Sequence, residues 1–341
     1  MPEHPNGNTQ NLMDALSEVL RVIKIDSAIY LNGEFSEPWC LASPEACALA
    51  PMLTKGPGQV IIYHLLCEGK AYIQLTGGAR VVLSAGDLIT LPHGHGHLLG
   101  SGSHVTPIDA GAALPGVLER GLDLLHIGGG GTPCRFICGF LVCDAQLSQA
   151  FFSALPPLIK VSICDDASGQ WLQNSLKFSV EQASNNEAGA NAMLTKLSEV
   201  LFAETLRRYI RDLPEGQTGW FAATRDPMVG KSLTLLHHRH THPWTLAELA
   251  HETGLSRTVL AERFRHFLGE PPMTYLTRWR LRLGARGLIS TSHSVAQIAI
   301  EAGYESEAAF NRAFKREYGL PPCPLPEDKS RWALRNPVSA R

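Results

Sequence analysis

Two stretches near the carboxyl-terminal end of the chain repeat each other: LAELAHETGLSRTVLAERFRHFLGEPP at residues 246–272 and VAQIAIEAGYESEAAFNRAFKREYGLPP at residues 295–322. The matched positions carry small, turn-forming or apolar residues: Ala250 and Ala299, Gly254 and Gly303, Leu260 and Phe310, Phe264 and Phe314, Gly269 and Gly319. The second stretch has one extra residue just after its turn glycine. Such a repeat indicates one structural unit that is used twice.

Each repeat predicts two helices joined by a tight turn. The first helices begin at Thr245-x-x-Glu248 and Ser294-x-x-Gln297, which have the capping-box spacing that gives free helix amides a partner. The matched glycines then supply a turn in which a positive φ carries no side-chain penalty. Beyond the turn, apolar residues four positions apart mark the buried face of a second helix, so its other face is free. The pattern is that of two helix-turn-helix units.

A further helix is predicted between the two units, over residues 273–288. Its apolar face is expected to contain Leu276, Leu283 and Leu288. The same segment carries four arginines: Arg278, Arg280, Arg282 and Arg286.

The charge of the chain is unevenly distributed. From Lys231 to Arg341 there are 16 Lys and Arg against 10 Asp and Glu, a net charge of +6, whereas the rest of the chain carries −8. A basic terminal domain suits binding to DNA phosphates, although a solvated basic surface would give the same count. Together with the duplicated helix-turn-helix pattern, the charge favours double-stranded DNA as a partner.

These residues resemble the AraC/XylS family of transcription regulators, above all in SVAQIAIEAGYESEAAFNRAFKREYGLPP. The resemblance implies that both second helices enter successive major grooves of DNA. It places the following residues at the DNA: Arg257, Thr258, Ala261, Glu262 and Arg265 in the first unit, and Glu307, Ala308, Asn311, Arg312, Lys315 and Arg316 in the second. After Pro322 the chain continues CPLPEDKSRW, which departs from the family's usual ending.

The two units are not expected to read DNA equally. Asn311 and Arg312 have side chains that make bidentate contacts to adenine and guanine, whereas Ala261 and Glu262 stand at the corresponding positions of the first unit. Arg265, Lys315 and Arg316 are expected at phosphates, which set register without reading sequence. The resemblance further implies an activator that contacts RNA polymerase and responds to a small-molecule, metal or redox signal.

The amino-terminal part has a different texture. Between about residue 29 and residue 142, β-branched runs such as QVIIYHLL and RVVL alternate with Gly, Pro and Ser clusters, which is typical of a small β sandwich or barrel. This part resembles the cupin-type sensor domains of the same family. The predicted fold class is therefore α+β, with a cupin-like β-barrel followed by an all-α domain. The expected boundaries are 1–165 for the sensor, 166–225 for a helical connector, 226–325 for the DNA-binding domain and 326–341 for a tail.

The cupin motifs leave a metal site open. Gly86-x5-Pro92-x-Gly94-x-x-His97 fits the second cupin motif as far as its histidine, but the first motif has Ile62 where a further histidine is expected. His64 and His97, with Cys138 or Cys143, would suit zinc or iron. The alternative is that His64 is a hydrogen-bonded core residue and that the turn at 93–97 is solvated.

The cysteines offer a second sensor hypothesis. A thiol of low pKa among Cys40, Cys67, Cys134, Cys138 and Cys143 would be open to oxidation, with Cys138 as first choice. Regulators of the reactive-chlorine-responsive branch of the family make this hypothesis relevant. Buried, inert cysteines are the simpler alternative.

A long amphipathic helix is predicted over residues 192–210, where Leu194, Leu197, Leu201 and Leu206 recur at helical spacing. Such a helix either caps its own domain or forms the seam of a homodimer. Both alternatives remain open at this point.

The sequence argues against several other classes of protein. No run approaches the roughly 18 apolar residues of a membrane span, and the start MPEHPNGNTQ lacks the features of a secretory signal, so a cytoplasmic protein with reduced thiols is expected. Ser/His/Asp, P-loop and dinucleotide signatures are missing, which argues against an enzyme. The competing hypothesis is a cupin metalloenzyme with an accessory DNA-binding-like domain.

Overall fold

A computed structural model describes residues 14–22, 25–53, 58–103, 105–143 and 151–322. The chain divides into two compact units. The sheet unit consists of Lys24–Asp212, and the helical unit consists of Met1–Ile23 together with Leu213–Arg341.

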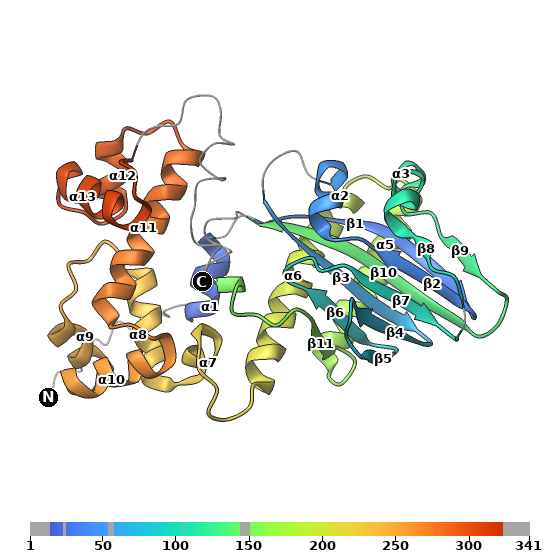
Figure 1. The fold of residues 1–341 in the computed structure, drawn as a ribbon, viewed down its shortest axis with the longest axis horizontal. Helices are drawn as coiled ribbons and strands as arrows, with labels where there is room; N and C mark the ends of the chain where they lie inside the picture. Colours follow the sequence, from blue (N-terminus) through green and yellow to red (C-terminus); the bar gives the residue numbers. More distant parts are fainter. Residues whose placement is uncertain (1–13, 23–24, 54–57, 104, 144–150, 323–341) are drawn as a thin grey trace, which may run out of the picture. The chain divides into compact units, whose positions relative to one another are not determined.

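The sheet unit contains two sheets (Figure 1). Six strands follow the order β11-β6-β3-β10-β1-β9: β11 (Ile159–Ser162), β6 (Asp87–Leu91), β3 (Gln59–Glu68), β10 (Pro133–Cys143), β1 (Ile25–Ser36) and β9 (Leu125–Gly128). Five strands follow the order β5-β4-β7-β2-β8: β5 (Arg80–Ser84), β4 (Lys70–Leu75), β7 (His97–Ser101), β2 (Trp39–Ser43) and β8 (Ile108–Asp109). Most neighbouring strands are antiparallel, as expected for a cupin-like barrel.

One apolar core joins both sheets. Phe35 and Phe136 from the six-stranded sheet and Trp39 from the five-stranded sheet are almost fully buried, and the rings of Phe35 and Trp39 stack with centroids 4.2 Å apart. β3 is buried along nearly its whole length, which explains its continuous apolar sequence QVIIYHLL. The interior of the barrel is therefore apolar except where the buried His64, His97 and Cys138 enter it from β3, β7 and β10.

Four helices of the sheet unit are described over their full length: α2 (Ala46–Leu53), α3 (Ala110–Arg120), α5 (Ala167–Ser184) and α6 (Ala190–Asp212). The helical patterns of α2 and α3 do not stand out in the sequence, because Pro51 and Pro115 interrupt them. α6 packs on β1, β10 and β11, and the Ser198 hydroxyl lies 2.8 Å from the Tyr63 hydroxyl of β3. The helix predicted over 192–210 thus covers its own domain. Residues 166–212, expected in a connector, belong to the sheet unit.

The helical unit is built from eight described helices: α1 (Ala15–Val22), α7 (Trp220–Arg225), α8 (Pro227–His238), α9 (Leu246–Thr253), α10 (Arg257–Leu268), α11 (Pro272–Ser290), α12 (Val295–Glu301) and α13 (Glu307–Tyr318). Figure 1 shows α10 and α13 at opposite ends of α11. α11 is the helix predicted between the repeats. Leu276 and Leu288 are buried as expected, but Leu281 takes the buried place assigned to Leu283, which is only half-buried.

Among the described helices of this unit, α1 is the one that precedes the barrel in the sequence. It packs on α8 through Leu16 and Val19, and the buried Glu18 carboxylate accepts hydrogen bonds from Arg21 at 2.9 Å and from His238 at 3.0 Å. The expected bounds place these residues in the sensor domain, 1–165. In the structure α1 packs in the helical unit instead. In the described part of the chain no helix is both long and apolar enough to cross a membrane.

Candidate nucleic-acid interface and barrel interior

Both helix-turn-helix units form as the repeat predicts. The Thr245 and Ser294 hydroxyls accept from the amides of Glu248 and Gln297, at 3.1 and 3.2 Å. The reciprocal half of each capping box is not made, because Glu248 pairs with His242 and Gln297 donates to Glu301. At each helix start, the capping box thus supplies one hydrogen bond, which the backbone amide donates to the cap hydroxyl.

The turns and buried faces also follow the prediction. Gly254 and Gly303 have φ values of 72° and 87°, a region that side chains rarely adopt. The extra residue of the second repeat lies in its turn: α10 is capped by Ser256, two residues after Gly254, whereas α13 is capped by Ser306, three residues after Gly303. The apolar pairs on α10 and α13 are fully buried: Leu260, Phe264, Phe310 and Phe314.

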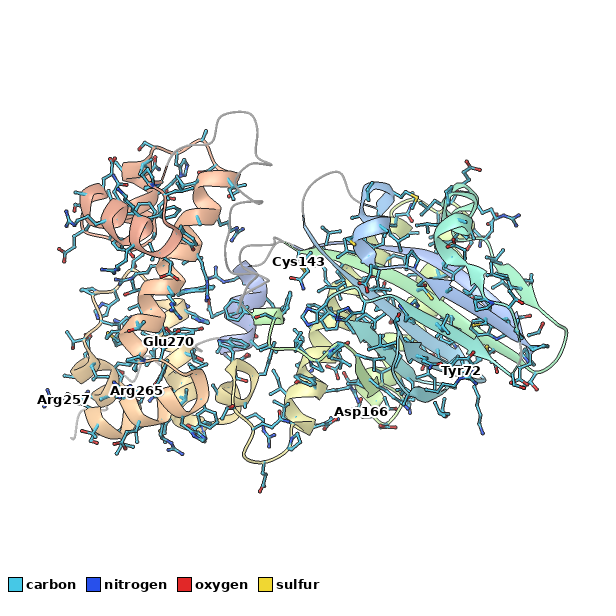
Figure 2. All side chains as sticks on the ribbon, viewed as in Figure 1. Tyr72, Cys143, Asp166, Arg257, Arg265 and Glu270 are labelled. Carbon is cyan, nitrogen blue, oxygen red and sulfur yellow. The ribbon has the colours of Figure 1, made fainter. Side chains whose placement is uncertain are left out.

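Most residues proposed to contact DNA are on the surface. The exposed ones are Arg257, Thr258, Glu262 and Arg265 on α10, and Glu307, Ala308, Arg312, Lys315 and Arg316 on α13. Ala261 and Asn311 are half-buried. Figure 2 shows Arg257 projecting outward from the start of α10. The outer faces of both second helices are therefore available to a ligand.

The structure separates cations that the sequence does not distinguish. Arg263 pairs with Asp226 at 2.9 Å, Arg278 pairs with Glu270 at 3.0 Å, and Arg280 donates to the carbonyls of His240 and His242. These arginines hold the unit together. Among described residues, five other cations on α10 and α13 form neither a hydrogen bond nor an ion pair: Arg257, Arg265, Arg312, Lys315 and Arg316.

Asn311 differs from the other residues of its face. Its Oδ1 atom is buried and has no hydrogen-bond partner among described residues. A bidentate contact to adenine needs both the oxygen and the nitrogen of the amide. Asn311 must therefore rotate before it can make the contact proposed for it.

Inside the barrel, three of the predicted sensor residues meet. His64 on β3 lies between Cys138 on β10 and His97 on β7: its Nδ1 is 2.9 Å from Cys138 Sγ, and its Nε2 is 2.9 Å from His97 Nε2. All three are buried, so the turn at 93–97 is not solvated at His97. Cys143 is remote, because β10 pairs Cys138 with His64 but Cys143 with Gln59; Figure 2 shows it near one end of the sheet unit.

The hydrogen bonds among these three residues determine which of their atoms carry protons. His97 Nδ1 lies 2.9 Å from the His95 carbonyl, which only accepts, so His97 donates there and its Nε2 accepts from His64. His64 Nδ1 is then an acceptor, and the Cys138 thiol donates to it. Burial, and for His64 also the neighbouring imidazole of His97, lowers the pKa of both histidines, which keeps them neutral.

The three residues do not fit one metal ion. Cys138 and His97 contact opposite nitrogens of the same imidazole, so one ion cannot bind all three in this arrangement. The described residues contain no group of three His, Cys, Asp or Glu side chains placed to bind a metal. His64 is the hydrogen-bonded core residue of the alternative hypothesis.

The thiols differ from the low-pKa cysteine that was hypothesised. Burial raises the pKa of Cys67 to about 12, that of Cys134 to about 11, and that of Cys138 well above its ordinary value. These groups are thiols at neutral pH. Any chemistry at Cys138 needs a base that removes the proton during the reaction.

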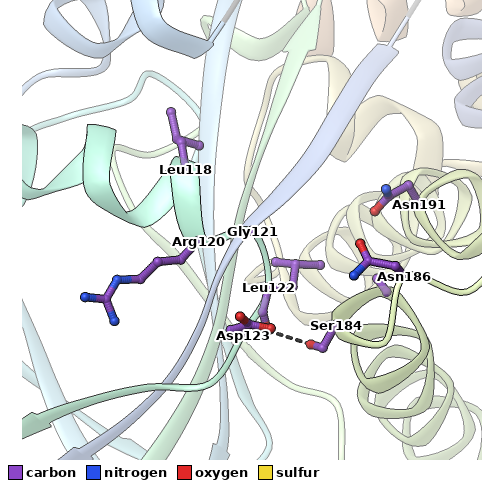
Figure 3. Close-up of a pocket in the computed structure, with 9 residues that line it drawn as sticks. Leu118, Arg120, Gly121, Leu122, Asp123, Ser184, Asn186 and Asn191 are labelled. Atoms are coloured by element: carbon purple, nitrogen blue, oxygen red, sulfur yellow. Dashed lines mark hydrogen bonds between the residues drawn. The ribbon is translucent and has the colours of Figure 1, made fainter.

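Two hollows occur in the sheet unit. One, of about 80 Å³, lies in the barrel under α3; Leu31, Leu41, Leu99, Leu114 and Ile127 contribute to its wall, and His64 and Cys138 reach it. The other, of about 260 Å³, lies between the end of α3 and the turn from α5 to α6 (Figure 3). Its polar residues Arg120, Asp123, Asn186 and Asn191 are exposed, and Ser184 is half-buried. Of these two hollows, the barrel cavity is the one lined by fully buried polar residues, His64 and Cys138.

Comparison with known proteins agrees with this division. A family model described as a cupin matches residues 14–211, and one described as a helix-turn-helix domain matches residues 249–323. A putative AraC-like transcription regulator of Streptomyces antibioticus is 30% identical over 311 residues, covering 91% of this chain and 97% of the relative. The chain belongs to the AraC-like transcription regulators.

Two further relatives cover almost the whole AraC-like chain. The HTH-type transcriptional regulator AlkR of Acinetobacter baylyi is 27% identical, covering 91% of this chain and 98% of the relative. The RCS-specific HTH-type transcriptional activator RclR of Escherichia coli is 25% identical, covering 91% and 96%. This AraC-like regulator thus has a cupin domain that suits ligand sensing and a carboxyl-terminal domain that binds DNA.

Proposed function

We propose that α10 and α13 lie in two successive major grooves of a promoter, and that a signal received in the barrel cavity changes their occupancy of DNA. The observation that carries the first part is that free cations gather on the outer faces of α10 and α13 while nearby arginines are paired. α11, with 19 residues, is about 28 Å long at 1.5 Å per residue, comparable to the roughly 34 Å repeat of DNA.

A mobility-shift titration over a range of salt concentrations tests this assignment. Arg312→Ala is expected to weaken binding by about 1 to 3 kcal/mol and to relax the preference for the base pair under α13, because a guanine contact is lost. Arg265→Ala should weaken binding to all sequences alike and lower the salt slope by about 1, as for a phosphate contact. Arg211→Ala, which removes an exposed arginine of the sheet unit, is the matched control. Unchanged affinity in Arg312→Ala would contradict the assignment.

The unequal side chains support unequal reading. Exchanging base pairs under α13 should cost more affinity than exchanging them under α10, because Arg312 makes bidentate bonds and Ala261 cannot. A larger cost under α10 would reverse the proposed order of the units.

The regulator is further proposed to activate transcription in the cytoplasm through contact with RNA polymerase. The name of the relative RclR, an activator, supports this direction. Run-off transcription on a bound promoter tests it: the full chain should raise transcript yield, and a fall in yield would identify a repressor.

An exposed apolar face supports the proposal of a homodimer. Trp171 and Phe178 lie two turns apart on α5 with exposed fractions of 61% and 56%, and Met193 and Val200 lie two turns apart on α6 with 53% and 46%. A second copy of this chain would cover these side chains. Phe178→Glu should convert a dimer to a monomer in analytical ultracentrifugation, whereas Val82→Glu, at an exposed apolar position on β5, should not.

A further inference from the structure

The barrel cavity combines an apolar wall with a polar corner. Among the described residues that line it, Ser43, His64 and Cys138 are polar and the rest are aliphatic, with no charged side chain. A charged molecule would lose its hydration there without compensation. The volume of about 80 Å³ is smaller than the roughly 150 Å³ of an apolar cavity that holds benzene. The cavity therefore suits an uncharged molecule of only a few heavy atoms.

The polar corner contains a nucleophile beside a base. The Cys138 thiol donates to His64 Nδ1 at 2.9 Å, which is the arrangement that activates a sulfur for attack. His64 Nε2 donates to His97 Nε2 at 2.9 Å, so the proton can pass through one imidazole to the next. His97 is the first residue of β7, and the charge of the Glu45 carboxylate acts to raise the pKa of His97, against the effect of burial. The carboxylate thus favours a positive charge on His97.

We propose that Cys138 adds covalently to small uncharged α,β-unsaturated carbonyl compounds that enter the barrel cavity, with His64 and His97 relaying the thiol proton. The sulfur forms a bond to the β-carbon, and the electron pair of the C=C π bond moves onto the carbonyl group to give an enolate. The thiol proton passes to His64 Nδ1 while the Nε2 proton of His64 passes to His97. The relay then returns one proton to the α-carbon, so S–H adds across C=C without an oxidant or a reductant.

The relay explains how a buried thiol can react. A thiol without a base at this depth remains protonated, because burial disfavours the thiolate. Cys67 provides that comparison: it is buried on β3, and among the described residues its Sγ donates a hydrogen bond only to the Leu65 carbonyl, at 3.9 Å. Cys47 is exposed and provides the opposite comparison.

The test uses the full chain, methyl vinyl ketone as the small electrophile and N-ethylmaleimide as the bulky one, with peptide mass mapping over time. Methyl vinyl ketone should modify Cys138 at least tenfold faster than Cys67, and N-ethylmaleimide should modify Cys47 while sparing Cys138. Equal rates at Cys138 and Cys67 would overturn the proposal, since both would then report only local opening. Added oxygen at Cys138 without a carbon adduct would overturn it as well.

Variants of the relay make the test specific. His64→Gln should slow addition at Cys138 by about 100-fold, the usual scale of general-base catalysis, and His97→Gln should slow it less. The rate at Cys47 in the same samples serves as the internal control, and thermal unfolding checks that each variant folds. An unchanged Cys138 rate in a folded His64→Gln variant would overturn the relay.

The regulatory consequence rests on the proposed function, and the readouts separate the two. Adduct formation is read by mass alone, without DNA. The adducted chain and an equally treated Cys138→Ser chain are then compared in the mobility shift. If the adduct forms but both chains bind DNA alike, the covalent chemistry holds and signalling from the barrel to DNA does not.

Discussion

The two helix-turn-helix units have similar second helices, α10 and α13, but these helices pack against different neighbours. In the first unit, α10 contacts α7, α8 and α9, and the buried Phe264 ring meets Tyr275, which also bonds to Trp220 and His237. In the second unit, α12 and α13 pack on α11 around a core that contains Phe310, Phe314 and Ile298. The two units therefore share their helix-turn-helix geometry but differ in the helices that surround it. The units should respond differently to changes in their packing and alike to changes in their local caps.

The turn glycines should give the largest difference. An added Cβ at Gly303 would lie 2.8 Å from Thr241 Cα and 2.9 Å from the His240 carbonyl oxygen, whereas one at Gly254 would meet nothing within 4 Å. Both substitutions carry the strain of a positive φ, about 1 to 2 kcal/mol. Gly303→Ala adds steric overlap and should cost about 3 kcal/mol in all, against about 1 for Gly254→Ala. Urea unfolding measures both, and equal costs would contradict this difference in packing.

The second-largest effect should be a loss of folding stability in the first unit at low pH. Burial lowers the pKa of His237 to about 3 from 6.5, so below pH 6.5 the unfolded chain binds a proton that the folded unit does not. Stability therefore falls as the pH drops through this window, by about 2 kcal/mol at pH 5. Residues 295–322 contain no histidine. Hydrogen exchange at pH 5 should show α10 losing protection before α13. The His237→Gln variant should not show this pH dependence. If α10 and α13 of the original chain lose protection together, the prediction is wrong.

The helix caps should give the smallest effects. Thr245→Ala and Ser294→Ala each remove one hydroxyl that accepts from a first-turn amide, so each should cost about 1 kcal/mol. Because the cap is local, the two costs should agree despite the different surroundings. If thermal unfolding gave clearly different costs for the two substitutions, the stability of the caps would depend on the surrounding helices.

The same contrast explains which features the sequence predicts. The cap hydroxyls, the turn glycines and the Phe264 and Phe314 positions depend on neighbours within a few residues, and they follow the prediction, whereas the reciprocal half of each capping box is not made. The pairing of arginines depends on residues far apart in the sequence: Arg263 pairs with Asp226, the N-cap residue of α8, which no local spacing reveals. Which cations are paired and which are free is therefore decided by the tertiary structure and not by local spacing.

The barrel interior shows more clearly which features cannot be predicted from the sequence. His64, His97 and Cys138 come from β3, β7 and β10, and only the strand register brings them together. The sequence supplied the correct residue types but added Cys143, which the register places five positions further along β10. It also suggested a metal, because spacing alone does not show that Cys138 and His97 lie on opposite sides of one imidazole.

The position of α1 has a consequence for the order of folding. Its partner α8 begins more than 200 residues later in synthesis, after the whole barrel has emerged. The barrel can fold as it leaves the ribosome, whereas α1 must wait for α8 before Leu16 and Val19 are covered. A fragment starting at residue 213 would lack this helix, leaving an apolar strip on α8 bare. Supplying residues 14–22 as a separate peptide should raise its solubility.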